Sequence, residues 1–482
     1  MNATAYVETN VAQRLDRLPW SRWHWLVVLA LGITWILDGL EVTLVSALGG
    51  VLQLPTTLHL TAAEVGLSAT VYLIGQVVGA LFFGFATDRI GRKKLFYATL
   101  LIYLTGTALT AFSVNFFMFA LFRFIAGTGI GGEYSAINSA IDELIPARVR
   151  GQVDLVINST YWAGAMLGAL GTFVVLNPHL LPAAWGWRLS FILGGFLGLL
   201  ILLFRHWVPE SPRWLATHGR GREAEEIVES VEREVTADPT SLPPLVGRKQ
   251  RLRIREYTPW SEIWHAIARQ YPTRSILGFT LMVTQAFLYN AIFFTYALIL
   301  VQFYNVPPET VSVYLFPFAF GNLLGPILLG HLFDSIGRKT MITLTYAVSG
   351  VLLAVTGYLF QIGVLNALTQ TIAWSVIFFI ASAAASSAYL TVSEIFPLEI
   401  RGLAIAIFYA CGTLAGAFAP AIFGAIIGTG SRTALFWAYC FAGAVMIVAA
   451  IVELFLGVKA ERQSLESIAT PLSQVLQTEP VT

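Results

Sequence analysis

Charged residues are scarce in this sequence. Lys, Arg, Asp and Glu make up 12% of the 482 residues, whereas hydrophobic residues make up 56% and the mean hydropathy is +0.70. A soluble chain of this length needs more charge to cover its surface, so the composition argues against a soluble globular protein. The formal net charge of +1 gives no electrostatic footprint for nucleic acid. The composition therefore predicts a membrane protein with no nucleic-acid partner.

Cysteine is nearly absent as well. Cys411 and Cys440 both lie in apolar segments and indicate neither a disulfide framework nor a metal site. No metal-ligand cluster, nucleophile–base pair or nucleotide-binding motif stands out, so we expect no metal, no cofactor and no enzymatic activity. The glycine-rich stretch 127–132 follows no strand and lies in an apolar run, which favours close helix packing over a phosphate-binding loop.

Apolar stretches long enough to cross a bilayer, about 20 residues each, recur along the whole chain. The first 22 residues contain no short apolar core with a cleavage site, so the first stretch is interpreted as a retained helix and not as a signal peptide. The fold class predicted is an all-α membrane protein with twelve transmembrane helices. They are placed at 24–48, 65–87, 95–112, 115–140, 155–176, 188–208, 274–302, 311–333, 340–361, 366–392, 402–427 and 433–457.

Two six-helix bundles joined by a polar linker are the predicted domain organisation. The basic run between residues 248 and 255 is interpreted as a linker segment lying against anionic lipid, and not as a nucleic-acid patch. The polar tail is expected to be flexible. The predicted parts are an N-terminal segment at 1–22, a first bundle at 23–208, a linker with short helices at 209–273, a second bundle at 274–458 and a tail at 459–482.

The orientation follows from where the basic residues fall, because cytoplasmic loops hold the excess of Lys and Arg. Basic residues gather in alternate loops, as expected for an even number of helices with both termini in the cytoplasm. The loops assigned to the outside contain almost none. The residues that define the pattern are Arg89, Arg92, Lys93, Lys94, Arg148, Arg150, Arg338, Lys339 and Arg401.

Two motifs occur twice in the chain, once in each half. The segment Gly84–Lys94 follows the second predicted helix, and Gly330–Lys339 follows the eighth. The segment Glu143–Gly151 is matched in the same way by Glu394–Gly402. Chance rarely places two such pairs in matching order, so we expect two parallel halves with the functional site at their interface.

These motifs resemble those of a known family. The Gly-x-x-x-Asp-Arg-x-Gly-Arg-Lys loop and its second copy resemble the signature of the major facilitator superfamily. The paired Glu-x-x-Pro-x-x-x-Arg-Gly segments, together with Pro209–Trp214, are similar to the branch that holds sugar porters and organic-ion transporters. The resemblance covers nearly the whole chain. It implies alternating access, in which the two halves rock about a central site and open it to one side at a time.

The charges of the repeated motifs fit a gate at the cytoplasmic ends of the helices. Ion pairs among them would hold these ends together while the outside is open, and would break in each cycle. The alternative is that they only anchor loops and set the topology. The gate residues predicted are Asp88, Arg92, Glu133, Glu143, Arg150, Asp334, Arg338, Glu394 and Arg401.

Charges within the hydrocarbon region are costly and point to function. Asp38 and Glu41 lie three residues apart on the first helix and hence near one face. Glu41 and Arg123 lie about seven and eight residues from the outer ends of their helices, hence at nearly the same depth. A carboxylate and a guanidinium at one depth can pair, and protonation of the carboxylate would release the pair. The alternative is a fixed buried network that only shapes the bundle.

We therefore predict that Glu41 is the principal proton carrier. Arg123 would be its partner or the anchor of an anionic substrate, and Asp38 would share the proton or bind substrate. The chain resembles the aromatic acid:proton symporters, which have Asp-Gly-x-Asp in helix one, although the second acid here is Glu41. Sugar porters place an acid and an arginine at the positions of Glu41 and Arg123.

The predicted substrate contacts lie on helices seven and ten, in addition to Arg123. Gln285, Asn290 and Tyr296 are polar positions among aromatic residues that suit an apolar ring, and each has an ordinary interhelical hydrogen bond as its alternative. Sugar porters have a Gln-Gln pair at Gln285, where this chain has a single glutamine. The segment Tyr389–Glu394 looks more like the organic-ion and aromatic-acid branches, so Tyr389 joins the candidates.

The function predicted from the sequence is proton-coupled uptake of a small organic solute, with an organic or aromatic acid ahead of a sugar. One alternative is a sugar or polyol:proton symporter. Another is a membrane sensor that does not transport its solute, which the short C-terminal tail disfavours. The partners expected are the solute, protons and the lipid bilayer of the plasma or inner membrane, and we expect a monomer.

Overall fold

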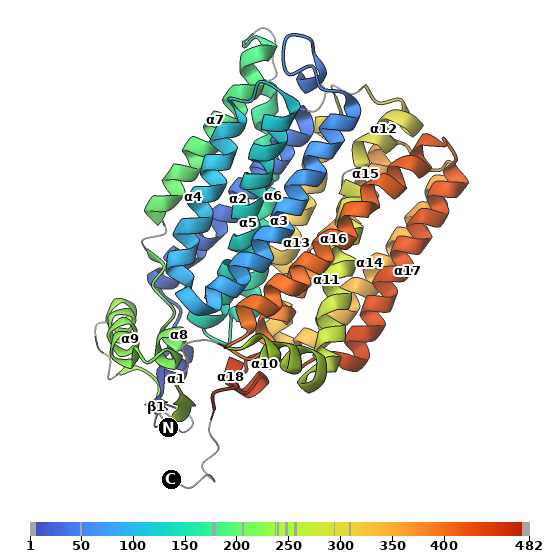
Figure 1. The fold of residues 1–482 in the computed structure, drawn as a ribbon. Helices are drawn as coiled ribbons and strands as arrows, with labels where there is room; N and C mark the ends of the chain where they lie inside the picture. The colour runs from blue at the N-terminus through green and yellow to red at the C-terminus, as the bar shows by residue number, and fades with distance from the viewer. Residues whose placement is uncertain are drawn as a thin grey trace.

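Two bundles of long helices stand side by side in the computed structural model (Figure 1). The first contains α2 (Arg22–Leu48), α3 (Ala62–Ile90), α4 (Arg92–Thr110), α5 (Phe116–Leu144), α6 (Arg150–Val175) and α7 (Ala183–Phe204). The second contains α11 (Pro272–Phe293) followed by α12 (Tyr296–Tyr304), then α13 (Val311–Ser335), α14 (Arg338–Gln361), α15 (Ala367–Glu394), α16 (Arg401–Gly428) and α17 (Arg432–Leu456). The residues described are 6–48, 51–175, 180–204, 207–236, 238, 241–245, 249–254, 258–293, 295–307 and 310–474.

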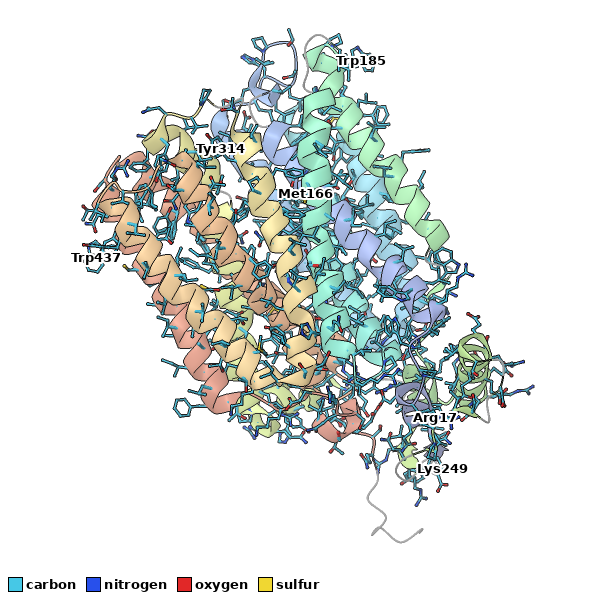
Figure 2. The ribbon with its side chains drawn as sticks, turned by 180° about the vertical axis from the view of Figure 1, so that it is seen from behind. Arg17, Met166, Trp185, Lys249, Tyr314 and Trp437 are labelled. Carbon is cyan, nitrogen blue, oxygen red and sulfur yellow. The ribbon has the colours of Figure 1, made fainter. Side chains whose placement is uncertain are left out.

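The predicted fold class is confirmed. In the described part of the chain, nine helices are long and apolar enough to cross a membrane, and α4, α6 and α7 complete the two six-helix bundles. Large apolar side chains cover the outside of the bundles, where lipid would contact them. Trp437 is 65% exposed and points away from α17 (Figure 2), and Phe455 is 74% exposed.

The helices begin and end where local chemistry requires. The Thr61 side chain accepts a hydrogen bond from the Glu64 backbone N–H, and the Glu64 carboxylate accepts one from the Thr61 N–H, so a capping box starts α3. Gly91 separates α3 from α4 with a φ of 99°, and Gly337 separates α13 from α14 with a φ of 120°. Side chains other than that of glycine rarely adopt these angles, which explains why both copies of the repeated motif have glycine there.

The two bundles meet along α6 with α13 and along α3 with α16. Within the first bundle α2 lies against α6 so closely that a Cβ atom at Gly39 would be 1.9 Å from the Tyr161 carbonyl oxygen. This contact between backbones holds the charged face of α2 in place.

One end of the molecule carries the linker elements and the first and last described residues (Figure 1). We call this end the linker face and the opposite end the far face. Figure 2 places Arg17 and Lys249 at the linker face and Trp185 at the far face. The short elements at the linker face are α1 (Val11–Asp16), α8 (Pro212–Thr217), α9 (Gly221–Val235), α10 (Trp260–His265), a π-helical turn (Ala266–Gln270) and α18 (Leu465–Ile468). At the far face a 3-10 turn, η1 (Val51–Gln53), precedes α3.

The N-terminal segment is tied to the linker. Strand β1 (Tyr6–Thr9) pairs in antiparallel fashion with β2 (Gln250–Arg253), with Tyr6 opposite Arg253. Arg14 and Arg17 both donate to the Glu232 carboxylate of α9. Burial alone would raise the pKa of Glu232, but the hydrogen bonds from the two arginines outweigh it, and its pKa is lowered.

The expectation of a flexible tail is wrong for residues 460–474. The Glu399 carboxylate accepts hydrogen bonds from the Leu472 N–H at 3.0 Å and the Ser473 N–H at 2.9 Å. Glu466 pairs with Arg213 of the linker at 2.7 Å, and Leu465 and Ile468 are buried. Polar composition predicted flexibility, but a carboxylate of the second bundle supplies the acceptors that hold this segment. Residues 475–482 lie outside the described residues.

Candidate functional site

The structure brings Glu41 of α2 and Arg123 of α5 together. Their side chains form a buried ion pair, with Glu41 3% and Arg123 2% exposed. The Thr107 hydroxyl of α4 donates to the second carboxylate oxygen of Glu41 at 3.0 Å, and the Arg123 guanidinium lies 4.0 Å from the centre of the Tyr72 ring. Four helices of the first bundle, α2 to α5, therefore supply this pair and its neighbours, and protonation of Glu41 would leave Arg123 without its counter-ion.

Asp38 lies one turn from Glu41 in a different environment. Its oxygens accept hydrogen bonds from the Tyr72 hydroxyl at 3.2 Å and the Tyr134 hydroxyl at 2.8 Å, and it is 1% exposed. Among the described residues no basic side chain forms an ion pair with Asp38. Asp38 is thus held by hydroxyl donors, whereas Glu41 is held by a cation.

Aromatic side chains from both bundles surround Tyr134. We call Trp35, Tyr134, Tyr389 and Tyr409 the central aromatic cluster. Tyr134 stacks on Tyr409 with ring centres 4.3 Å apart, and Trp35 meets Tyr134 edge-on at 4.4 Å and Tyr389 at 5.9 Å. The Trp35 indole N–H is buried and has no acceptor among the described residues. The cluster therefore joins the two bundles beside Asp38 and holds a donor that a solute could use.

The predicted substrate contacts separate into two groups. Gln285 donates to the Tyr389 hydroxyl at 3.3 Å, so both lie at the cluster. The Tyr296 hydroxyl instead contacts Thr371 at 2.7 Å, and its ring packs on Phe318 and Trp374 inside the second bundle. Asn290 faces α16 within the same bundle. Tyr296 thus makes an ordinary interhelical hydrogen bond, which was the alternative to a substrate contact.

Sequence reasoning missed Trp35, Tyr72, Tyr134 and Tyr409. An aromatic residue in an apolar helix has the same pattern whether it faces lipid, core or the other bundle. One signal was available, because Trp35 precedes Asp38 by three residues and hence shares its face.

Each copy of the repeated motif builds the same ion-pair group at the linker face. In the first bundle Arg92 pairs with Glu143 at 2.9 Å and with Asp88 at 3.5 Å. In the second bundle Arg338 pairs with Glu394 at 3.1 Å and with Asp334 at 2.5 Å. The predicted gate residue Glu133 is buried in α5, next to Tyr134 and almost three turns from Glu143.

The two groups are linked across the gap between the bundles. Arg150 lies 3.7 Å from Glu394, and Arg401 lies 3.7 Å from Glu143. Backbone groups strengthen the contact, since the Gln152 N–H donates to Asp334 at 2.7 Å and the Leu403 N–H donates to Asp88 at 3.1 Å. The hydrogen bond from the Tyr409 hydroxyl to the Gln76 side chain also joins the bundles. Among the described residues, it is the hydrogen bond or ion pair between the bundles that lies closest to the far face. The linker face is closed in this structure.

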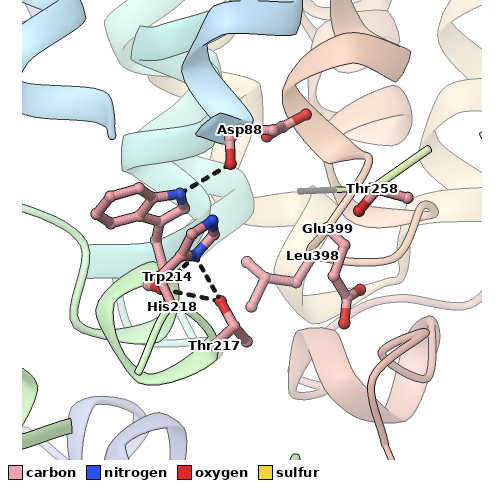
Figure 3. Close-up of a pocket in the computed structure, with 7 residues that line it drawn as sticks. All are labelled: Asp88, Trp214, Thr217, His218, Thr258, Leu398 and Glu399. Atoms are coloured by element: carbon pink, nitrogen blue, oxygen red, sulfur yellow. Dashed lines mark hydrogen bonds between the residues drawn. The ribbon is translucent and has the colours of Figure 1, made fainter. Parts of the chain in front are cut away.

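The linker covers these charges from outside. The Glu210 carboxylate accepts a hydrogen bond from the Arg92 N–H at 2.8 Å at the start of α4, and the Trp214 indole donates to the Asp88 carbonyl at 3.0 Å. Figure 3 shows Trp214 and Asp88 in a small pocket with His218 and Glu399. Burial lowers the pKa of His218, so this side chain is neutral at physiological pH.

Comparisons with known proteins agree with this architecture. Residues 41–471 match the family model described as sugar (and other) transporter. The niacin transporter NiaP of Acinetobacter baylyi is 28% identical over 95% of this chain and 99% of its own length. Myo-inositol transporter 2 of Schizosaccharomyces pombe is 28% identical over 88% of this chain and 78% of its own. The proton:xylose symporter XylE bound to 6-bromo-6-deoxy-D-glucose aligns with a TM-score of 0.74 and 18% identity, over 92% of this chain and 98% of its own, which shows a shared fold.

Proposed function

Since the chain belongs to the sugar (and other) transporter family of integral membrane proteins, we propose that it is a proton-coupled symporter that takes up a small organic solute by alternating access. The observation that carries this proposal is the buried Glu41–Arg123 pair, one turn from an acid that faces the interface between the bundles. We further propose that the linker face is cytoplasmic, as the distribution of basic residues predicts.

The coupling step is a change of charge at Glu41. With Glu41 ionised, the pair is neutral as a whole and Arg123 is held away from the cluster. Protonation leaves Arg123 without its counter-ion in a low-dielectric site, so a new anion or a rearrangement has to satisfy it. An anionic solute would supply that charge, which links solute binding to the proton. Asp38, held by two tyrosines of the first bundle, would share the proton or contact the solute.

The gate is formed by the two ion-pair groups at the linker face. Contacts within each bundle are short, whereas the arginine–carboxylate contacts between the bundles are 3.7–4.0 Å long. Longer contacts are weaker, so the bundles can part while each group stays intact. Opening of the linker face would then release the solute and the proton to the cytoplasm.

An organic or aromatic acid is the solute class that these residues favour. The central aromatic cluster offers ring faces and the free Trp35 N–H, and Arg123 offers a cation for a carboxylate. The relative NiaP is named for niacin, an aromatic acid. A sugar or polyol is the second candidate because the matched family model and the myo-inositol transporter bear those names. Such a solute needs many polar partners, and Gln285 is the amide that reaches the cluster among the predicted contacts.

Uptake into proteoliposomes tests the proposal. Purified protein is screened by thermal shift against nicotinate, benzoate, myo-inositol and xylose, and the hits are followed with an imposed pH gradient. A gradient of one pH unit should concentrate a solute about tenfold if one proton accompanies it. Uptake that ignores the gradient would refute proton coupling, and stabilisation without any uptake would identify a sensor instead.

A matched pair of variants locates the proton. Glu41→Gln should abolish gradient-driven accumulation but spare exchange of solute across the membrane, because exchange needs no net proton transfer. Glu453→Gln removes another buried acid, on α17 of the second bundle, and should accumulate solute as the wild type does. Accumulation by Glu41→Gln at the wild-type level would show that the proton binds elsewhere.

A further inference from the structure

Two helices of the first bundle present polar side chains to the second bundle below the central aromatic cluster. On α5, Tyr134, Asn138 and Asp142 follow one another at intervals of four residues and share one face. That face looks toward the second bundle, because Tyr134 stacks on Tyr409 and Asp142 lies 4.0 Å from Arg401.

Helix α6 repeats this arrangement with Asp154, Asn158 and Trp162. Trp162 contacts Tyr289 of α11 and Phe318 of α13, so this face also looks toward the second bundle. Asp154 and Asn158 are 0% and 7% exposed. The interface between the bundles therefore contains a buried polar layer between the aromatic cluster and the ion pairs.

Asp154 is well separated from the central site. The Thr160 hydroxyl donates to the Gly32 carbonyl at 2.8 Å, and Gly164 packs on Ile36, which fixes the register of α6 on α2. In this register Asp38 is level with about residue 166, twelve residues from Asp154, or about 18 Å at 1.5 Å per residue. Asp154 lies in the second turn of α6, near the linker face.

The polar layer has too few donors for its acceptors. One Asp154 oxygen accepts from the Asn158 amide at 3.1 Å, and the other has no donor among the described residues. The side-chain carbonyl oxygens of Asn138 and Asn158 likewise have no donor in the described part of the chain. Leaving such groups unpaired costs about 1–3 kcal/mol each. A proton bound to Asp154 would supply a donor to this layer.

Asp154 also differs from the acids of the two ion-pair groups at the linker face. Asp88, Glu143, Asp334 and Glu394 each have an arginine within 4.0 Å, whereas no such pair is found for Asp154 among the described residues. The charges that act on it most are those of Asp142, Glu394 and Arg338. Two of these three are carboxylates, so an ionised Asp154 would be repelled.

Charged and titratable groups lie at the linker ends of the helices around Asp154. They are Arg22 and His24 of α2, Asp142 and Glu143 of α5, Arg150 of α6 itself, His331 and Asp334 of α13, Arg338 of α14, Glu394 of α15 and Arg401 of α16. The arginines closest to the layer, Arg150, Arg338 and Arg401, are already bound to other carboxylates.

We propose that Asp154 is a second proton-binding site, which holds a proton while the linker face is closed and releases it to the cytoplasm when this face opens. The inference rests on the proposed function insofar as the linker face is the cytoplasmic one. In the closed state the carboxyl O–H of Asp154 donates to a neighbouring amide oxygen. On opening, this O–H bond breaks and the proton passes to water, leaving a carboxylate that water or a freed arginine stabilises. No other bond changes.

This site makes opening depend on pH. The neutral acid suits the buried layer, whereas the carboxylate suits the open, hydrated state. Alkaline pH therefore favours opening of the linker face and acid pH favours closure. An asparagine at this position mimics the neutral acid and should keep the face closed at any pH.

The test measures opening without any solute. Spin labels are attached at Lys94→Cys and Ser335→Cys, exposed positions at the linker ends of the two bundles, after replacement of Cys411 and Cys440 by alanine. In the otherwise native protein the ratio of long to short label separations should rise with pH, by up to about tenfold per unit where one proton is lost. Asp154→Asn should show the short separation from pH 6 to 9, and Asp154→Glu should restore the response.

Infrared spectroscopy of the same proteins supplies the second readout. Asp154→Asn should lose part of the protonated-carboxyl signal at pH 7. Glu232→Gln, which removes an ionised acid paired with Arg14 outside the gate, should leave that signal unchanged. An unchanged signal in Asp154→Asn, or an equal pH response of the label separation with and without Asp154, would overturn the inference. The label and infrared measurements use no solute. If the uptake experiment showed no proton-driven accumulation, the proposed function would be refuted, but the proton site at Asp154 would still be tested separately by these measurements.

Discussion

The two bundles share the ion pairs of the proposed gate but not their intramembrane charges. Asp88, Arg92 and Glu143 of the first bundle have counterparts in Asp334, Arg338 and Glu394 of the second, with similar contacts. In contrast, every Asp, Glu, Lys and Arg of α11–α17 lies in the first or last turn of its helix. Asp38, Glu41 and Arg123 lie well inside theirs. In the proposed mechanism the symmetric ion pairs close the linker face, and the charges found in one bundle alone couple transport to the proton.

The largest loss of stability should follow removal of Arg123, an intramembrane charge without a counterpart in the second bundle. Arg123→Ala leaves the Glu41 carboxylate buried without its cation, which should cost about 3–5 kcal/mol of stability. Thermal unfolding in detergent measures the loss. The double variant Glu41→Gln/Arg123→Ala should regain part of it, because no buried charge is left unpaired. A double variant less stable than Arg123→Ala would contradict the pairing.

The gate variants should behave alike in the two bundles. Arg92→Ala and Arg338→Ala each remove the arginine that two buried acids of the same bundle share, and each should favour the open linker face by about 1.5–3 kcal/mol. Accessibility of a cysteine introduced at Ser135, which donates to the Gly402 carbonyl across the gap, reports opening. If one variant opened the face and the other did not, the gate would not be symmetric.

Two helix contacts, one from each bundle, should differ in the cost of an added methyl group. A Cβ atom at Gly39 would lie 1.9 Å from the Tyr161 carbonyl oxygen, whereas one at Gly412 would lie 2.7 Å from the Met282 carbonyl oxygen. Gly39→Ala should therefore cost about 1–3 kcal/mol, and Gly412→Ala less. Chemical denaturation of both variants measures the difference. Equal losses would mean that α2 can move away from α6 without cost.

The smallest predicted change in stability is local and affects the contact between the N-terminal segment and the linker. Because the pKa of Glu232 is lowered in the folded protein, its stabilisation is complete above its ordinary pKa of 4.5 and is lost as pH falls through the lower folded value. Limited proteolysis near residue 14 should therefore accelerate below pH 4.5 in the wild type. Glu232→Gln should be cleaved at one rate across this range, and a pH-dependent rate in that variant would assign the effect to another group.

The helices and the repeated ion-pair motif were predictable because each depends on local signals. Apolar runs gave the twelve helices, and the predicted ends fall within a few residues of the observed ones at most positions. Helices α6 and α7 each begin five residues earlier than predicted, and α5 continues to Leu144 instead of ending at 140. Its last turn contains Asp142 and Glu143, whose charges are accommodated by arginines of other helices. Hydropathy does not contain that information.

The site was only partly predictable for a similar reason. Depth along two helices sufficed to pair Glu41 with Arg123. The sequence does not say that Asp38 would meet two tyrosines, or that Tyr296 would turn into its own bundle, because rotation of a helix about its axis is fixed by packing. The tail was mispredicted because its partner, Glu399, lies more than 60 residues away.

Proton movement at Glu41 is the central claim, and it can be measured directly. In lightly buffered proteoliposomes without a pH gradient, addition of a transported solute outside should make the external solution more alkaline as protons enter with it. Glu41→Gln should bind and exchange the same solute with no change in external pH. An alkaline shift of wild-type size in Glu41→Gln would contradict the account.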